Sequence, residues 1–306
     1  MEIVVKQIIA IVITYKPDIV ALENMIRNIE SQNVEALIVN NGENFDIDER
    51  LQSKIIQMDS NVGIARAQNK AFEYAESLEY KFVAMFDQDS VVPNNYFKHM
   101  LDVMDSSNIG MAVPRIKDLN TMNYVESRSY NRQDKIHIFI PNSDVESNKN
   151  EVQNVAIPIA SGAVVRIKTW REVGGMTDKL FIDAVDTDFD IRVLIAGYDI
   201  VQNNRVLLEH PIGKREPVKL FGRTVFWNTN HTALRRYTIA RNSIWLYKSY
   251  HQYIRGLFSI VFRTLITHSI YIFFEKQGFF SKFVLIQKGL AVGLFRKSPI
   301  EIERVR

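Results

Sequence analysis

The chain has 306 residues, of which 46% are hydrophobic and 24% charged, as expected for one or two globular domains and not for a disordered or low-complexity chain. It has no cysteine, which excludes a disulfide scaffold, a thiolate metal site and a cysteine nucleophile. The net charge of +3 conceals an imbalance: residues 205–306 hold 18 Lys and Arg against 5 Asp and Glu, whereas residues 1–204 hold 20 against 30.

The first hundred residues alternate between strand-like and helix-like patterns. Four short apolar runs predict buried strands: Ile8–Thr14, Ala36–Val39, Lys54–Met58 and Phe82–Phe86. The helical spacing of apolar residues predicts one helix that begins at Pro17 and a second helix at residues 64–78. Strands that alternate with helices imply a parallel sheet covered on both faces, in an α/β fold that binds ligands beyond the carboxyl ends of its strands.

Polar residues follow each of these four predicted strands directly. The four clusters are Thr14-Tyr15, Asn40-Asn41-Gly42, Asp59-Ser60-Asn61 and Asp87-Gln88-Asp89. Asn, Asp and Gly also make ordinary turns, so one such cluster alone would carry little information. Four clusters after four strands predict a single polar edge at which a ligand binds.

The middle of the chain is less regular. Residues 118–153 are polar and weakly periodic, so we expect a long excursion or a flexible loop there. Order returns at residues 161–167, and a helix is expected at residues 184–196. A further strand at residues 206–209 leads directly into His210.

From His231 onward the pattern predicts helices alone. Residues 257–274 and 279–295 are strongly apolar but are interrupted by basic residues such as Arg263 and Lys288. A spanning helix needs about 20 apolar residues with few charges. We therefore expect these helices to lie in a membrane interface, with packing against the rest of the chain as the alternative.

Asp87 and Asp89 stand one residue apart at the end of an apolar strand. Two carboxylates on a fixed strand end can hold one divalent cation that keeps open positions for substrate phosphates. His210 follows another strand and would complete the metal shell as a neutral imidazole, although a lone histidine is more often structural.

A second acidic cluster begins the helix expected at residues 184–196. Asp186 lies near its N-terminus and is a candidate general base, with favourable helix-start chemistry as the alternative explanation. Asp188 stands four residues before Arg192, which predicts a solvated ion pair on the helix surface.

Arginines recur in the helix predicted after His231. Arg235 and Arg241 lie close in sequence and would bind a diphosphate, because guanidinium groups match phosphate geometry. The alternative is a basic surface that faces solvent or lipid.

Over residues 8–250, these motifs resemble the family 2 glycosyltransferases of the GT-A fold, and within them the bacterial rhamnosyltransferase-like branch. The matching strings are Ile13-Thr14-Tyr15, Asn40-Asn41-Gly42, Asn61–Asn69, Phe86-Asp87-Gln88-Asp89-Ser90, Ser161-Gly162, Leu180–Asp188 and His231–Asn242. No single string is specific, but their order and spacing together are.

The resemblance implies a GT-A catalytic domain with a Rossmann-like, nucleotide-binding sheet at residues 1–230. Its donor half would span about residues 1–115 and its acceptor half about residues 155–230. Residues 231–306 would form a C-terminal helical extension, which we expect to associate with a membrane because it is basic and apolar.

The resemblance also implies a dTDP- or UDP-sugar donor, an inverting transfer and a divalent metal, Mn²⁺ or Mg²⁺. The donor-binding residues would be Thr14, Tyr15, Asn41, Asp59, Asn61, Asn69, Asp87, Gln88, Arg235 and Arg241. Asp89 would be the more direct metal ligand, beside Asp87 and His210. Asp186 would be the catalytic base, but Val185 replaces the usual preceding glutamate, which leaves the choice open between Asp186 and Asp183.

The expected function is therefore transfer of a sugar, with rhamnose favoured, to a hydroxyl of a growing cell-surface polysaccharide or a lipid-linked saccharide. The enzyme would be cytoplasmic and peripheral on the inner face of a bacterial membrane. The alternatives are a sugar nucleotidyltransferase, disfavoured because residues 14–18 hold no glycine, and a non-catalytic module that binds a nucleotide or a membrane. Apolar, aromatic helices argue against nucleic acid, and a homo-oligomer is left open.

Overall fold

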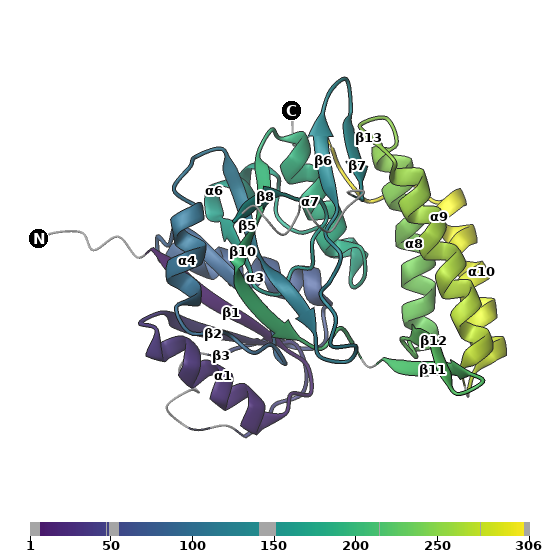
Figure 1. The fold of residues 1–306 in the computed structure, drawn as a ribbon, viewed down its shortest axis with the longest axis horizontal. Helices are drawn as coiled ribbons and strands as arrows, with labels where there is room; N and C mark the ends of the chain where they lie inside the picture. The colour runs from purple at the N-terminus through teal and green to yellow at the C-terminus, as the bar shows by residue number, and fades with distance from the viewer. Residues whose placement is uncertain are drawn as a thin grey trace, which may run out of the picture.

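The computed structural model describes residues 7–46, 48, 55–140, 151–213, 215–275 and 277–302. Its centre is a mixed eight-stranded sheet with the order β3-β2-β1-β4-β9-β5-β10-β8 (Figure 1). The strands are β1 (Ile8–Thr14), β2 (Glu35–Asn40), β3 (Ile55–Gln57), β4 (Phe82–Asp87), β5 (Ile109–Asp118), β8 (Val152–Asn154), β9 (Ala163–Arg166) and β10 (Asp199–His210). The α/β fold class predicted from the sequence is confirmed.

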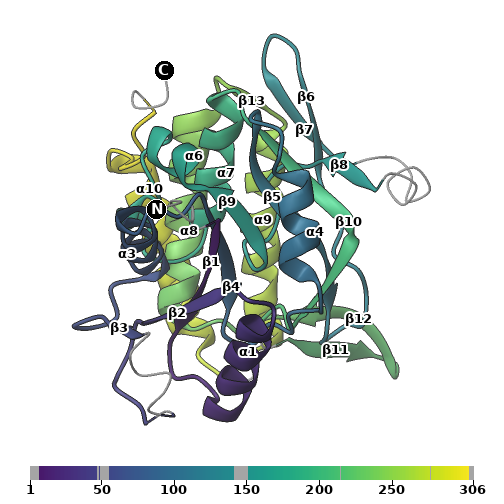
Figure 2. The same ribbon diagram turned by 90° about the vertical axis from the view of Figure 1, so that its left-hand side faces the viewer.

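Both faces of the sheet are covered, which explains the continuous apolar runs. Along β1, Ile9 and Ile11 face one hydrophobic cluster, whereas Ala10 and Val12 face the other. The helices α1 (Ile19–Ser31) and α4 (Tyr96–Val103) pack on the second face, and α3 (Ile64–Ser77), α6 (Ile167–Glu172) and α7 (Val185–Ile195) pack on the first. Figure 2 shows α3 and α4 on opposite sides of the sheet.

The predicted polar edge is present. The strands β3, β2, β1 and β4 are neighbours and run parallel, with Thr14 paired to Asn40 and Ile13 paired to Asp87. Their carboxyl ends therefore meet along one edge. The helix expected from Pro17 begins two residues later, because the Asp18 side chain accepts a hydrogen bond from the Ala21 amide and caps it. Of the third predicted strand, Lys54 lies outside the described residues.

Residues 118–153 are more ordered than the sequence predicted. They contain the antiparallel hairpin of β6 (Ser129–Arg132) and β7 (Ile136–Phe139), joined in parallel by β13 (Ile254–Arg255). Four-residue strands are too short for a clear alternating pattern, and the pairing with β13 bridges more than a hundred residues. Residues 141–150 lie outside the described residues.

The C-terminal region is helical, as predicted, except for the two-residue strand β13, which corrects the expectation of helices alone. The helices α8 (Ala233–Tyr250), α9 (Leu257–Tyr271) and α10 (Phe279–Phe295) stand as one layer at the side of the molecule, and a short helix η2 (Ile272–Phe274) follows α9 (Figure 1). Gly289 and Gly293 let α10 approach α8 closely: a Cβ at Gly289 would lie 2.5 Å from the Tyr237 carbonyl oxygen. The division predicted at residue 230 stays a prediction.

Two features tie this layer together. Arg236 and Glu275 form a fully buried ion pair, and Lys282 joins the same carboxylate, so α8, η2 and α10 are linked. The hairpin of β11 (Glu216–Leu220) and β12 (Arg223–Asn228), which the sequence analysis missed, packs Phe226 5.3 Å from the ring of Tyr271. The C-terminal helices therefore dock on the rest of the chain along one side.

Candidate active site

A cavity of about 400 Å³ opens at the carboxyl ends of β1, β2 and β4. Nine of the residues predicted for the site line it: Thr14, Tyr15, Asn41, Asn61, Asp87, Gln88, Asp89, His210 and Arg235. They come from segments spread over more than 220 residues of sequence. The parallel sheet brings the first seven together, and β10 and α8 add the last two.

Hydrogen bonds between the loops shape the floor of this cavity. The Gln88 side chain accepts a hydrogen bond from the Tyr15 amide at 2.8 Å and donates one to the Tyr15 carbonyl at 3.3 Å, which joins the ends of β1 and β4. Asn41 donates to Asn61 at 3.2 Å and accepts from the Val62 amide at 2.9 Å, which joins the loops after β2 and β3. Tyr15 stays half exposed, so its ring is free to contact a base.

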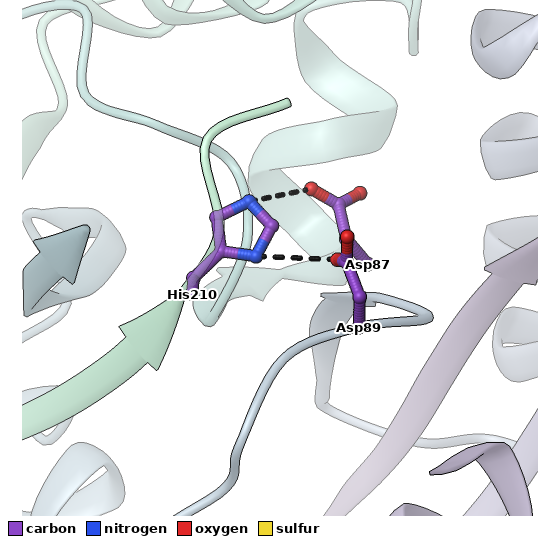
Figure 3. Close-up of side chains that lie close together, drawn as sticks. All are labelled: Asp87, Asp89 and His210. Atoms are coloured by element: carbon purple, nitrogen blue, oxygen red, sulfur yellow. Dashed lines mark ion pairs between the residues drawn. The ribbon is translucent and has the colours of Figure 1, made fainter. Parts of the chain in front are cut away.

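Asp87, Asp89 and His210 form a compact cluster in this cavity (Figure 3). The imidazole lies between the two carboxylates, with Nε2 3.3 Å from Asp87 and Nδ1 3.3 Å from Asp89. The ligand atoms of all three lie within 4.8 Å of one another. Two carboxylate oxygens and one imidazole nitrogen suit a divalent cation such as Mn²⁺, so the three residues fit the metal that the sequence predicted.

The charges around His210 support the same reading. Burial alone would lower the pKa of His210, but its hydrogen bond to Asp89 and the negative charges of Asp87 and Asp89 outweigh burial, so the pKa is raised. The same negative charges would stabilise a cation bound in place of that proton, with His210 neutral as a ligand.

Two buried serines, Ser90 and Ser161, contact this cluster and support it. The Ser161 hydroxyl accepts a hydrogen bond from the Asp87 amide at 3.1 Å and lies 2.6 Å from the Ser90 hydroxyl, which is 3.2 Å from His210 Nδ1. The sequence analysis quoted both serines within motifs but gave them no role. Nothing local in the sequence indicates that residues 71 positions apart would meet.

Asp186 lies at the N-terminus of α7, close enough to Asp87 and Asp183 for their charges to act on it. Burial, reinforced by those two negative charges, raises the pKa of Asp186 to about 7. In the described part of the chain, no hydrogen bond or ion pair engages its carboxyl group. A carboxylate with these properties is suited to remove a proton at neutral pH.

Asp183 is differently placed. Its carboxylate accepts hydrogen bonds from Arg235 Nε at 3.0 Å and from the Thr238 hydroxyl at 2.9 Å, and it thereby joins the turn before α7 to α8. Of the two candidates for the base, Asp186 has the freer carboxyl group.

The turn that carries Asp183 is strained and held by α8. Phe181, Asp183 and Ala184 have positive φ angles of 66°, 65° and 63°. The fully buried Asn242 side chain donates to the carbonyls of Leu180, Ile182 and Asp183 at 2.9–3.1 Å. Asn242 was noticed in a motif without a role, and the structure makes it a support of the turn.

The prediction for Asp188 is half right. It pairs with Arg192 at 2.6 Å, but both side chains are buried and not solvated. Asp188 also accepts hydrogen bonds from Thr177 at 2.7 Å and from Tyr250 at 2.6 Å. The sequence did not predict this burial. The helix α8 covers this side of α7, and the residue pattern of α7 alone does not indicate a contact with another helix.

Three predicted donor-binding residues do not line the cavity. Asn69 donates to Asp178 and to the Met176 carbonyl and lines a different cavity, so it supports a loop. Arg241 donates to the carbonyls of Lys179 and Leu180 and lies 4.4 Å from the Trp245 ring. Asp59 is exposed beyond β3. The positions of Asn69 and Arg241 within their motifs do not indicate that these two side chains bind backbone carbonyls.

Comparisons with known proteins agree with this geometry. The family model for glycosyl transferase family 2 matches residues 9–173. The chain is 28% identical over 271 residues to the dTDP-rhamnosyl transferase RfbF of Shigella flexneri, a match that covers 85% of this chain and 88% of that protein.

One solved structure shows the same fold. GalNAc-T7, crystallised with UDP, GalNAc and Mn²⁺, superposes with a TM-score of 0.57 at 11% identity, over 81% of this chain and 48% of that one, so this chain spans about half of its length. TarS of Staphylococcus aureus in complex with UDP matches 95% of this chain and 71% of its own, at 13% identity and a TM-score of 0.46. The family match covers more than half of the chain, and we conclude that this protein belongs to glycosyl transferase family 2, with a GT-A fold.

Proposed function

We propose that this protein transfers a sugar from a nucleoside diphosphate donor to an acceptor hydroxyl, with inversion at the anomeric carbon. The observation that carries the proposal is the placement of a free carboxyl group, Asp186, beside the Asp87–Asp89–His210 cluster at the edge of a nucleotide-binding sheet. Asp186 takes the proton from the acceptor hydroxyl, whose oxygen attacks the anomeric carbon from the face opposite the nucleotide. The bond to the diphosphate breaks in the same displacement.

The remaining residues of the cavity bind and orient the donor. In this proposal Tyr15, Asn41 and Asn61 hold the base and ribose, and Arg235 binds the diphosphate; its support is that all four line the cavity. Asp87, Asp89 and His210 would hold Mn²⁺ or Mg²⁺, which supplies positive charge to the leaving diphosphate when bound. Family membership favours this reading over a sugar nucleotidyltransferase or a non-catalytic binding module.

For the donor we propose dTDP-rhamnose. Its support is the similarity to a protein named as a dTDP-rhamnosyl transferase, over most of both chains. The alternative is a UDP-sugar. The test is to measure release of dTDP or UDP from dTDP-rhamnose, UDP-glucose and UDP-GlcNAc with Mn²⁺ present. We expect release from dTDP-rhamnose at ten times the rate of either UDP-sugar. Equal release from all three would contradict the donor assignment, and release from none would contradict the function.

We further propose that the enzyme works at the inner face of a bacterial membrane on a lipid-linked saccharide. Large apolar side chains are exposed on α9, η2, α10 and the tip of the β11–β12 hairpin: Phe258, Phe262, Phe273, Phe280, Phe295 and Phe221, the last being 96% exposed. Exposed basic residues lie among them: Arg263, Lys288, Arg296 and Arg223. Aromatic and basic side chains on one surface suit an anionic membrane interface.

We propose that these helices lie on the membrane surface and do not cross it. Among the described residues, one segment, Leu257–Phe274, is long and apolar enough to cross a membrane, which by itself is weak evidence, and 17% of it is buried. The docking of α8 with α9 and α10 favours a layer that lies on the membrane surface over a helix that crosses it.

A further inference from the structure

A second cavity, of about 210 Å³, lies between α7, α8 and α9. Its wall includes Asp183, whose carboxylate pairs at 3.0 Å with Arg235, and Arg235 in turn lines the donor cavity. The two residues of this ion pair therefore line different cavities, Asp183 the second cavity and Arg235 the donor cavity. Ala184 and Thr187 also line the second cavity, so the N-terminal turn of α7, which carries Asp186, forms part of its wall.

The lining is half polar and half apolar. Asp183, Thr187, His231 and His268 supply polar groups, whereas Ile239, Leu246, Leu257, Ile260 and Val261 supply an aliphatic wall. The rings of His231 and His268 stack with centroids 5.7 Å apart. Such a cavity suits a molecule with hydroxyls at one end and hydrocarbon at the other.

The two histidines are neutral over the working pH range. Burial, followed by the positive charges of Arg235 and Arg236, lowers the pKa of His231 to about 2. Burial and the same two arginines lower the pKa of His268 to about 3. A neutral imidazole offers one donor and one acceptor, as a hydroxyl does. His268 Nδ1 contacts Arg236, so Nε2 is the ring atom that His268 can offer to a sugar hydroxyl, and His231 adds a second neutral ring.

The helix α9 has two apolar faces. Leu257, Ile260, Val261, Thr264 and His268 line the cavity, at the spacing of one helical face. Phe258, Phe262, Ile266 and Ile270 are exposed on the other side, each between 43% and 60%. One helix thus separates the cavity from the surface that we propose to face the membrane, which explains why it is apolar nearly all round.

From this arrangement we propose that the second cavity binds the acceptor: the hydroxyl-bearing end of a lipid-linked saccharide, with the adjoining hydrocarbon against Leu257, Ile260 and Val261. The proposal rests on the proposed function, because it takes Asp186 as the base. The acceptor hydroxyl lies toward α7, where Asp186 receives its proton as the new glycosidic bond forms and the bond to the diphosphate breaks. The hydrocarbon leaves along α9 toward the membrane.

The test uses the full chain with Mn²⁺ and two probes, hexyl β-D-glucoside and methyl β-D-glucoside, whose binding is measured by calorimetry. Thr264→Phe fills the cavity from α9, and Ser259→Phe adds the same side chain at an exposed position of the same helix. We expect the wild type and Ser259→Phe to bind the hexyl probe at least ten times more tightly than the methyl probe. Thr264→Phe should weaken binding of the hexyl probe tenfold or more.

A third variant separates the cavity from the outer face of α9. Phe262→Ser alters only that outer face, and we expect it to bind the hexyl probe as the wild type does. Loss of binding in Phe262→Ser with retention in Thr264→Phe would overturn the proposal, as would failure of the wild type to prefer the hexyl probe.

Titration of dTDP into each protein shows that the donor site is folded and reports on the proposed function separately. If Thr264→Phe loses binding of the hexyl probe but keeps its dTDP affinity, the result supports the acceptor cavity. A wild type that binds the probe but no nucleotide would contradict the glycosyltransferase function while leaving a glycoside-binding cavity.

Discussion

The Asp183 carboxylate accepts hydrogen bonds from Arg235 and Thr238, whereas the described residues leave the Asp186 carboxyl without one. Burial raises the pKa of both carboxyl groups, but at Asp183 the charge and hydrogen bond of Arg235 and the hydrogen bond of Thr238 oppose the rise, whereas at Asp186 the charges of Asp87 and Asp183 add to it. From this difference we propose that Asp186 removes the proton and that Asp183 positions the turn.

At Asp186 we expect the substitution Asp186→Asn to lower kcat by about 10²–10⁴, because the amide cannot accept the proton. Binding of the donor should change little, since Asp186 does not line the donor cavity. Single-turnover transfer and dTDP calorimetry measure the two quantities.

Asp188→Asn is the comparison: it breaks a buried ion pair and should destabilise folding by about 3–5 kcal/mol while the folded fraction keeps its turnover. If Asp188→Asn is stable but inactive and Asp186→Asn is active, then Asp188 and not Asp186 is the base.

The pH dependence follows from the raised pKa of Asp186. The base acts only when ionised, and with a pKa of about 7 the ionised fraction falls as the pH drops through 7. We expect kcat/KM to decline about tenfold per pH unit below pH 6 and to be level above pH 8. The residual activity of Asp186→Asn should lack this acid limb. A wild-type profile that stays flat down to pH 5 would exclude Asp186 as the base.

Among the elements, the turn between η1 (Asp178–Leu180) and α7 depends on a side chain from α8. The three hydrogen bonds from Asn242 hold backbone that has positive φ at non-glycine residues. Gly63 lets the loop after β3 approach the same turn, because a Cβ there would lie 2.5 Å from the Phe181 carbonyl oxygen. The N-terminus of α7, and with it Asp186, is therefore positioned by two distant segments.

We predict that Asn242→Leu lowers kcat about 100-fold while dTDP affinity stays within threefold of the wild type. The physical reason is that the turn shifts, and a displacement of about 1 Å at a reacting group can cost this much. Steady-state kinetics measures kcat, and calorimetry measures dTDP affinity, so the two effects are determined separately. Leu234→Ala, at an exposed position of α8, is the control for substitution in this helix. Equal losses of kcat and dTDP affinity in Asn242→Leu would show that the turn also holds the donor.

At the scale of the whole molecule, the acidic and basic parts of the chain have separate places. Seven of the nine predicted residues that line the candidate site come from the acidic N-terminal part, and the basic C-terminal part supplies His210, Arg235 and the layer of α8, α9 and α10 at one side (Figure 1). From this distribution we expect the helical layer to face an anionic membrane. The proposed acceptor cavity lies between α7 and two helices of this layer, α8 and α9.

We predict that the protein sediments with vesicles that contain anionic phospholipid. Each basic residue near such a surface contributes about 1 kcal/mol, screened by salt, whereas apolar burial does not depend on charge. Binding should therefore weaken but persist at 0.5 M NaCl. The double variant Phe262→Ser with Phe273→Ser should lose the salt-resistant part, and Val20→Ser, an exposed position on α1, should bind as the wild type does. Wild-type protein left in the supernatant at low salt would refute the membrane surface.

The sequence by itself determined the strands β1, β2 and β4, the polar edge at their ends, the pair Asp87 and Asp89 and the C-terminal helices. Continuous apolar runs and the residues directly after them are local signals, and the family motifs occur in a fixed order. Only the tertiary structure decided which aspartate is free, that Asp188 is buried, and that Asn69 and Arg241 hold backbone carbonyls. It also revealed the supporting roles of Ser161 and Asn242 and the cavity under α9. These features depend on contacts between segments more than fifty residues apart, which no pattern along a single helix or strand encodes.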